Sequence, residues 1–178
     1  MPGEGECFSP CGAGSIYRRE TFLDLGGFDE AFFCYCEDVD LGYRLRLTGG
    51  QCIFVPDAVI EHAGGGSSGG GASAFSLFHG TRNRLWTYVG NTPALLFWAS
   101  LPAHLAITAA ILIRGLFTGR FADSWRGLIA GLDGLGPYWA RRKRLGKLKG
   151  SAHVLRYMSL SPIRMLMRKT DIKPLKRR

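Results

Sequence analysis

The feature that most constrains the fold is a stretch without formal charge, TPALLFWASLPAHLAITAAILI, from Thr92 to Ile113. Its length is roughly that needed to cross the hydrocarbon core of a bilayer as one helix. Pro93, Pro102 and His104 are unfavourable for a straight membrane-spanning helix. The stretch therefore predicts either a membrane span or helices that lie in, or dip into, one face of a membrane.

The following segment repeats apolar residues at helical spacing, with the charged residues off their face: Phe121, Trp125, Leu128, Ile129 and Leu132. This pattern predicts an amphipathic helix, either in a membrane interface or buried in a core. From Arg141 onward the sequence is rich in Lys and Arg, with scattered apolar residues. We therefore expect three regions: a first domain over 1–91, membrane-associated helices over 92–140 and a basic amphipathic tail over 141–178.

The formal net charge of +9 is unevenly distributed. Residues 1–113 carry a net charge of −5, and residues 114–178 carry +14. A basic tail of this kind usually meets phosphate groups, on lipids or on nucleic acid. The tail has no recognisable nucleic-acid-reading motif, and its Trp, Leu and Ile spacing favours lipid, so we expect an anionic membrane surface and no nucleic acid as partner.

The first region alternates short predicted elements. GSIYRRE is typical of a strand leading into a helix that ends at Gly26-Gly27, and FDEAFF of a turn. EDVDLGYRLRLTGG predicts a helix that begins with three acids and stops at a pair of glycines. QCIFVPDAVIEH predicts two short strands, and a Gly/Ser-rich loop over 64–73 then leads to a predicted helix over 75–91. The loop is either a plain linker or a mobile lid beside a site.

The five cysteines have no paired C-x-x-C spacing. This pattern argues against a disulfide framework or a zinc ribbon, so we expect free thiols in a reducing compartment.

Glu37, Asp38 and Asp40 lie within four positions and are flanked by aromatic residues. Like charges this close raise one another's pKa, so the cluster does not serve folding alone. On the residues alone, it is either a solvated helix start whose acids complement the helix dipole or a catalytic group. Asp40 is expected to pair with Arg44, four residues later on the same helix.

An ordered string of motifs gives a specific resemblance. CGAGSIYRRETFLDLGGFDEAFFCYCEDVDLGYRLRLTGG, followed by VPDAVIEHAGGGSSG and GTRNRLWTYVGNTP, resembles the C-terminal half of bacterial family 2 glycosyltransferases of the rhamnosyltransferase type. The resemblance covers about residues 7–93. It implies an α/β chain with the acceptor-side part of a GT-A fold, followed by membrane-associated helices. It also implies an inverting sugar transfer from a nucleotide-sugar donor to a cell-surface glycan or a polyprenyl-linked acceptor.

The resemblance assigns roles to the acids and to a histidine. Asp38, the second residue of the ED pair, is expected to be the general base that takes the proton from the acceptor hydroxyl. Glu37 would shape its field or contact the acceptor. His62 would help to bind a divalent metal, Mg²⁺ or Mn²⁺, that neutralises charge on the leaving diphosphate. A lone histidine after a strand is otherwise usually structural.

Two further segments match the acceptor side of the family. Gly12, Ala13 and Gly14 either line the acceptor, where small residues let the backbone approach a substrate, or form a tight turn. Arg82 and Asn83 either reach an acceptor phosphate or pair within their helix.

The first half of the family's fold, with its nucleotide-binding units and Asp-x-Asp motif, has no counterpart in this sequence. We therefore expect a truncated or mis-started copy, or a second chain that supplies that half, and little activity by this chain alone. Because nucleotide sugars are cytoplasmic, the expected location is the cytoplasmic face of the bacterial inner membrane. The alternative is a non-enzymatic membrane-binding remnant of such an enzyme.

Overall fold

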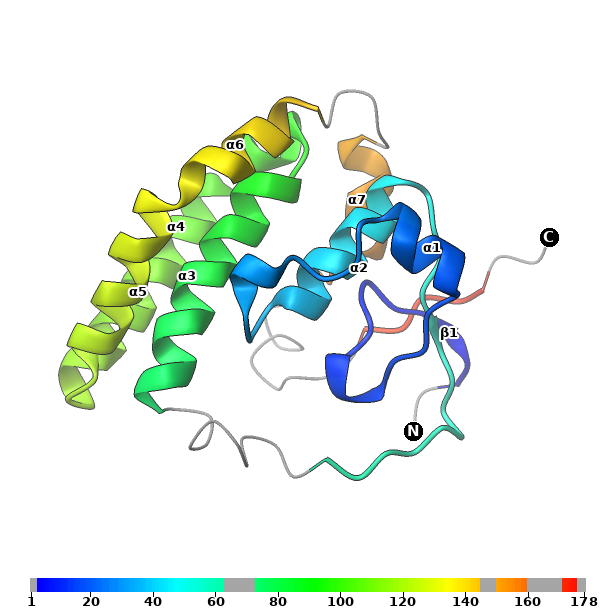
Figure 1. Cartoon of the computed structure of the whole chain (residues 1–178), viewed down its shortest axis with the longest axis horizontal. Coiled ribbons are helices and arrows are strands. Elements are labelled where there is room, and N and C mark those ends of the chain that lie inside the picture. Colours follow the sequence, from blue (N-terminus) through cyan, green and yellow to red (C-terminus); the bar gives the residue numbers. More distant parts are fainter. Residues whose placement is uncertain (1–2, 63–72, 145–149, 160–170, 176–178) are drawn as a thin grey trace.

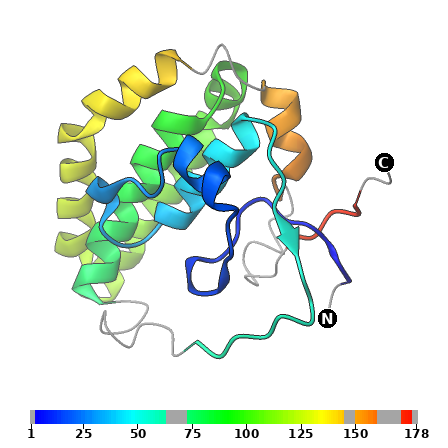
Figure 2. The ribbon, with the colours of Figure 1, turned by 45° about the vertical axis from the view of Figure 1, so that its right-hand side comes forward.

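A computed structural model describes residues 3–62, 73–144, 150–159 and 171–175 of the chain. Figures 1 and 2 show a group of long helices on one side and shorter elements with extended segments on the other. The elements in chain order are β1 (Gly5–Glu6), η1 (Gly12–Gly14), α1 (Arg19–Asp24), η2 (Glu30–Phe32), α2 (Glu37–Leu47), β2 (Ile53–Phe54), α3 (Ala74–Asn91), α4 (Ala94–Phe117), α5 (Phe121–Asp133), α6 (Leu135–Lys143) and α7 (Ser151–Tyr157). The described part of the expected α/β chain is therefore mostly helical, with one small sheet.

The sheet has two antiparallel strands. Gly5 of β1 faces Phe54 of β2, Glu6 faces Ile53, and a single bridge joins Glu6 to Lys173. The helices predicted after Tyr17 and at the acid cluster are confirmed as α1 and α2. The strand predicted before α1 and the second strand predicted after Pro56 are wrong, because these extended segments have no neighbouring strand among the described residues to complete a ladder.

A buried ion pair joins the sheet to α2. Arg46, on α2, is fully buried and donates a hydrogen bond of 2.7 Å to the carboxylate of Glu6. The same guanidinium donates to the carbonyl oxygens of Cys7, Phe8 and Gly50. Arginine suits this place because its planar fork can serve several acceptors at once. The contacts fix the register of α2 against the strands.

The main core cluster joins the first region to the long helices. Phe32 of η2 is fully buried, and it packs edge-on against Trp86 of α3 and Tyr138 of α6. Trp86 and Tyr138 stack on each other, with ring centroids 4.8 Å apart. Phe97 of α4 belongs to the same cluster. Packing therefore continues across residue 92, where the sequence predicted a boundary between regions.

The amphipathic helix predicted after Arg120 is α5. Unlike a core helix, it buries its small and polar residues and exposes large apolar ones. Its buried face consists of small or polar residues: Asp123, Ser124, Gly127 and Gly131. Gly127 lies so close to α3 that an added Cβ would be 2.4 Å from the carbonyl oxygen of Phe78. Trp125, Ile129 and Leu132 stay exposed. The apolar face of α5 thus points away from the protein.

The uncharged stretch forms α4, a single helix that continues through Pro102. It is long and apolar enough to cross a membrane, by length and composition, and 17% of its most apolar window is buried inside the protein. Its exposed side chains include Leu95, Trp98 and Phe117. α4 contacts α5 and α7.

Two sequence predictions fall partly outside the described residues. The Gly/Ser-rich loop lies there except for Ser73, whose hydroxyl oxygen accepts a hydrogen bond from the Ser76 N–H and caps α3. Of the basic tail, the described parts are the end of α6, the short helix α7 and residues 171–175. Val154 of α7 is fully buried in a cluster with Tyr43 and Leu47 of α2.

Candidate active site

The acid cluster occupies the first turn of α2. Glu37, Asp38 and Asp40 sit where the helix dipole favours negative charge, and Arg44 and Arg46 lie in the last turn, where it favours positive charge. Successive helix residues are about 100° apart, so positions 38 and 40 face nearly opposite directions. The three acids therefore have three different environments.

Asp38 is half-buried and held by backbone groups. Its Oδ2 accepts a hydrogen bond from the Gly12 N–H at 2.8 Å, and its Oδ1 accepts one from the Val39 N–H at 2.7 Å. Two donors fix the orientation of the carboxylate, but each oxygen keeps a further lone pair. A carboxylate held in this way can accept a proton from a bound hydroxyl group.

The structure brings the Gly-Ala-Gly segment to this carboxylate. Residues Gly12, Ala13 and Gly14 form η1, and all three are exposed. Gly12 contacts Asp38 directly, and an added Cβ at Gly14 would be 3.0 Å from the side chain of Ile60. The segment is a tight turn, which was one of the two interpretations of the sequence. Contact with an acceptor stays a prediction.

Glu37 lies beside Asp38 and is likewise half-buried. Burial, and then the charge of Asp38, raises the pKa of Glu37 above its ordinary value. Its Oε2 is buried and has no hydrogen-bond partner among the described residues. Burial also raises the pKa of the preceding Cys36 thiol to about 12, with the nearby charges of Asp38 and Glu37 as smaller causes. The two neighbouring carboxyl groups thus differ in their hydrogen-bond partners.

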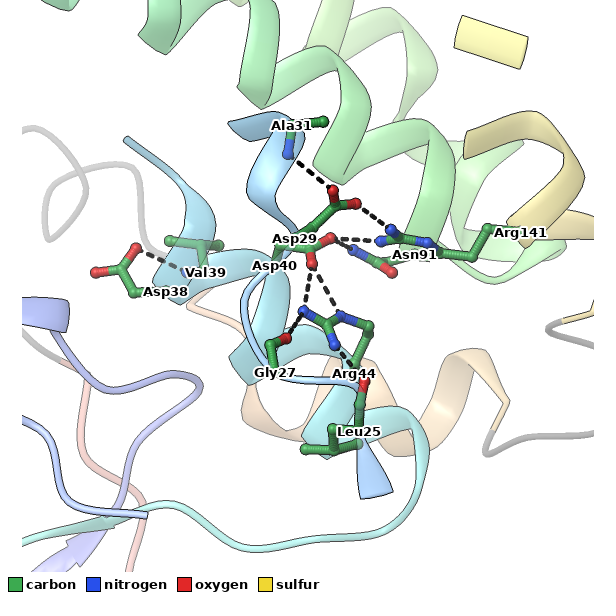
Figure 3. Close-up of polar contacts among 10 residues, drawn as sticks. All are labelled: Leu25, Gly27, Asp29, Ala31, Asp38, Val39, Asp40, Arg44, Asn91 and Arg141. Carbon is green, nitrogen blue, oxygen red and sulfur yellow. Dashed lines mark hydrogen bonds and ion pairs between the residues drawn. The ribbon is translucent and has the colours of Figure 1, made fainter. Parts of the chain in front are cut away.

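Asp40 is a buried structural hub rather than a solvent-facing acid. The predicted pair is confirmed: Arg44 contacts Asp40 Oδ2 at 2.8 Å. Asp40 Oδ1 also accepts hydrogen bonds from Asn91 Nδ2 at 2.7 Å and Arg141 at 2.8 Å. Figure 3 shows these partners converging on Asp40, whereas Asp38 lies apart on the other side of the helix start.

The hub extends to the turn before η2. Arg141 also contacts Asp29 at 2.5 Å, and Arg44 donates to the carbonyl oxygens of Leu25 and Gly27. Beside it lies a cleft with a volume of about 430 Å³, lined by Leu25, Gly26, Gly27, Asp29, Arg44, Arg141 and Arg144. Sequence reasoning missed Asp29, Asn91 and Arg141, because no local pattern indicates contacts between residues so far apart in the chain.

The loop before α2 has an unusual backbone. Phe33, Tyr35 and Cys36 have φ values of 60°, 68° and 65°, which residues with a side chain rarely adopt. Each such conformation costs on the order of 1–3 kcal/mol and persists only when surrounding contacts impose it. Cys36 is the N-cap of α2 but makes no side-chain cap hydrogen bond. The start of the acid motif therefore depends on contacts from elsewhere.

Arg82 and Asn83 of α3 supply those contacts. Asn83 is fully buried, and its Nδ2 lies 2.8–2.9 Å from the carbonyl oxygens of Phe32, Cys34 and Tyr35. Arg82 donates to the carbonyl oxygens of Ala31 and Phe32. These side chains thus bind the loop of their own protein, which the sequence did not predict. The predicted pairing within the helix is also present, because Arg82 Nε donates a hydrogen bond to Asn83 Oδ1. Contact with an acceptor phosphate stays a prediction.

His62 is exposed at the end of the extended segment after β2. Within the described ranges, no group of three or more His, Cys, Asp or Glu side chains comes together to hold a metal ion. The described residues do not by themselves fit a divalent metal, and its ligation by His62 stays a prediction.

Comparison with known proteins identifies the segment that carries this site. The family model "Glycosyltransferase like family 2" matches residues 3–85. An N-acetylglucosaminyl-diphospho-decaprenol L-rhamnosyltransferase from two strains of Mycobacterium tuberculosis is 33% identical over 102 residues, which are 56% of this chain and 33% of the relative. Rhamnosyltransferase WbbL of Escherichia coli K12 is 42% identical over 45 residues, 25% of this chain and 17% of that protein.

The chain spans about a third of the length of the mycobacterial relatives. No solved structure matches it significantly. The matched range 3–85 contains the acid motif, the Gly-Ala-Gly turn and the Arg-Asn pair. Residues 3–85 therefore resemble the glycosyltransferase family 2 model, and part of the chain is similar in sequence to two rhamnosyltransferases.

Proposed function

We propose that the chain supplies the acceptor side of an inverting glycosyltransferase with a GT-A type fold. The donor would be a nucleotide sugar, as the similarity to glycosyltransferase family 2 suggests, and the acceptor a lipid-linked glycan, as in the name of the mycobacterial relatives. The observation that carries the proposal is the half-buried Asp38 carboxylate, oriented by two backbone N–H groups with lone pairs to spare.

In the proposed step, Asp38 takes the proton of an acceptor hydroxyl while that oxygen attacks the anomeric carbon of the donor sugar. The bond between the anomeric carbon and the diphosphate oxygen breaks, and the nucleoside diphosphate leaves with the electron pair. Attack from the face opposite the leaving group inverts the anomeric configuration. Glu37, next to the base, would meet the acceptor as a neutral acid or as a charged neighbour according to pH.

A membrane surface would bring a lipid-linked acceptor to this site. The exposed apolar side chains of α4 and α5 support this part of the proposal, because α5 packs on α3 through its small residues and leaves Trp125, Ile129 and Leu132 outside. The net charge of +14 over residues 114–178 complements anionic headgroups, at about 1 kcal/mol per Lys or Arg near the surface. We place the protein at the cytoplasmic face of the plasma membrane, where nucleotide sugars are found.

The test is sugar transfer by the intact gene product, with a nucleotide-activated rhamnose and a polyprenyl-diphosphate-linked acceptor as probes. Asp38→Asn keeps the size and removes the base, and its single amide oxygen can still accept one of the two backbone N–H groups. We therefore expect transfer to fall by about 10²–10⁴-fold. Asp57→Asn, an exposed aspartate in the turn after β2, is the matched control and should leave transfer unchanged. Full transfer by Asp38→Asn would refute the proposal. Vesicle binding without any transfer by the wild-type protein would favour the membrane-binding remnant.

A further inference from the structure

The pair Arg82-Asn83 faces the loop that precedes the acid motif, although about 50 residues separate them in the sequence. Asn83 Nδ2 approaches three carbonyl oxygens, those of Phe32, Cys34 and Tyr35. An amide nitrogen has two hydrogens, so three carbonyl groups around it share two donors. The loop is therefore curled around one side chain.

The orientation of the Asn83 amide is itself fixed. Arg82 Nε donates a hydrogen bond of 2.8 Å to Asn83 Oδ1, so the oxygen faces a donor and the nitrogen faces the carbonyl groups. Arg82 also lies over the Trp86 ring, 4.4 Å from its centroid, which holds the guanidinium against the core. Asn83 is fully buried, so water does not compete for these contacts.

The contacts coincide with the unfavourable part of the backbone. Tyr35, with a φ of 68°, accepts from Asn83 through its carbonyl oxygen, and Cys36, with a φ of 65°, follows directly as the N-cap of α2. The Cys36 side chain itself makes no cap hydrogen bond at this helix start. The carbonyl contacts of Asn83 therefore hold the residues that lead into α2, which begins at Glu37, one residue before Asp38.

We propose that Asn83, oriented by Arg82, is a positioning residue that sets the start of α2 and thereby the placement of Glu37 and Asp38. The catalytic consequence rests on the proposed function, whereas the structural consequence does not. The inference assigns to the Arg-Asn pair a task inside the protein: it holds the acid motif in a backbone conformation that the local sequence would not adopt by itself.

The first readout needs no activity. In the intact gene product, Asn83→Ala should raise the rate of amide hydrogen exchange over residues 33–38 by at least about tenfold. In the variant, local opening of the loop no longer costs the free energy of the Asn83 contacts. Val89→Ala, a truncation in the core six residues further along α3, is the control for general destabilisation. Equal exchange of residues 33–38 in the two variants would overturn the proposal.

The second readout separates positioning from a merely structural role. A misplaced base lowers kcat by on the order of 100-fold with little change in KM. Partial unfolding lowers only the concentration of active enzyme, so kcat is unchanged once the rate is divided by the concentration of folded protein. Asn83→Ala should show the kcat loss and Val89→Ala should not. A change in KM alone would overturn the positioning role in favour of acceptor contact. If Asp38→Asn left transfer intact, the proposed function would fail, and the exchange experiment would still decide the role of Asn83.

Discussion

Arg141 donates a hydrogen bond of 2.8 Å to Asp40 Oδ1, although 101 residues separate the two in the chain. Asp40 belongs to the acid motif, and Arg141 lies at the end of α6, in the region that the sequence predicts to be a basic tail. The tail therefore begins with a residue that completes the buried environment of Asp40 on α2. Its first arginine is part of the fold as well as part of the positive surface.

The Arg141–Asp40 contact predicts a loss of stability on Arg141→Met. The change removes the Arg141 contacts with Asp40 and Asp29, while Arg44 and Asn91 still hold Asp40. We therefore expect a decrease of about 1.5–3 kcal/mol in the free energy of unfolding, measured by denaturant titration. Arg126→Met is the control, because Arg126 is 69% exposed and its pair with Asp123 should be worth less than about 1 kcal/mol. In the Asp40→Asn background, Arg141→Met should cost clearly less. Additive effects would contradict a direct interaction.

Glu37 predicts a specific dependence of stability on pH. Because burial raises its pKa in the folded protein, the folded state holds the proton more tightly than the unfolded state. The contribution of Glu37 to folding stability is fully present below the pKa of Glu37 in the unfolded state. It is lost as the pH rises through the pKa of Glu37 in the folded state. Glu37→Gln should therefore raise stability at neutral pH by less than about 1 kcal/mol, since water screens a half-buried group, and should flatten the pH profile above about pH 4.5. Glu20→Gln, at an exposed glutamate, should leave the profile unchanged.

Cys7 and Cys52 predict an oxidisable thiol pair. Their Sγ atoms lie 3.2 Å apart on paired backbone segments, and all five cysteines are free in the structure, as expected from the sequence. The hydrogen bond with Cys52, assisted by the charge of Arg46, lowers the pKa of the Cys7 thiol below its ordinary value, which favours its thiolate form.

Treatment with hydrogen peroxide should join Cys7 to Cys52 with release of water, detected by peptide mapping under non-reducing conditions. A bond that closes this loop would add up to about 4 kcal/mol to stability by the chain-entropy estimate. Cys7→Ser should abolish the product. Preferential oxidation of Cys34 or Cys11 would contradict the prediction.

The outward apolar face predicts binding to lipid vesicles. Trp98, Leu105 and Leu116 are exposed, and their spacing places them on one side of α4. Replacing all three by Glu should weaken sedimentation with anionic phospholipid vesicles by at least about 100-fold, because each apolar side chain contributes about 1.5–3 kcal/mol when fully buried. Ile16→Glu, at an exposed apolar residue far along the chain, is the control. Unchanged binding by the triple variant would rule out this face as the contact.

The sequence by itself determined the helices α1 to α5 and the motif, but not the strands. Acids in the first turn and glycines after the last turn mark α2, apolar spacing marks α3 and α5, and the uncharged length marks α4, because such signals depend on neighbouring residues. The pairing of Asp40 with Arg44 was equally predictable, since both lie on one helix four residues apart. The resemblance to family 2 glycosyltransferases rested on such contiguous strings.

Tertiary structure alone decided what surrounds the motif. Asn83 curls the strained loop, Arg141 and Asn91 bury Asp40, and the Gly12 N–H orients Asp38, all through contacts between segments 26 to 101 residues apart. It also turned α5 so that its glycines pack on α3 and its apolar residues face outward, where the hydrophobic pattern fits a core equally well. These arrangements depend on which helix surfaces pack against each other. The sequence pattern of a helix shows only which side chains share a face, not what that face contacts.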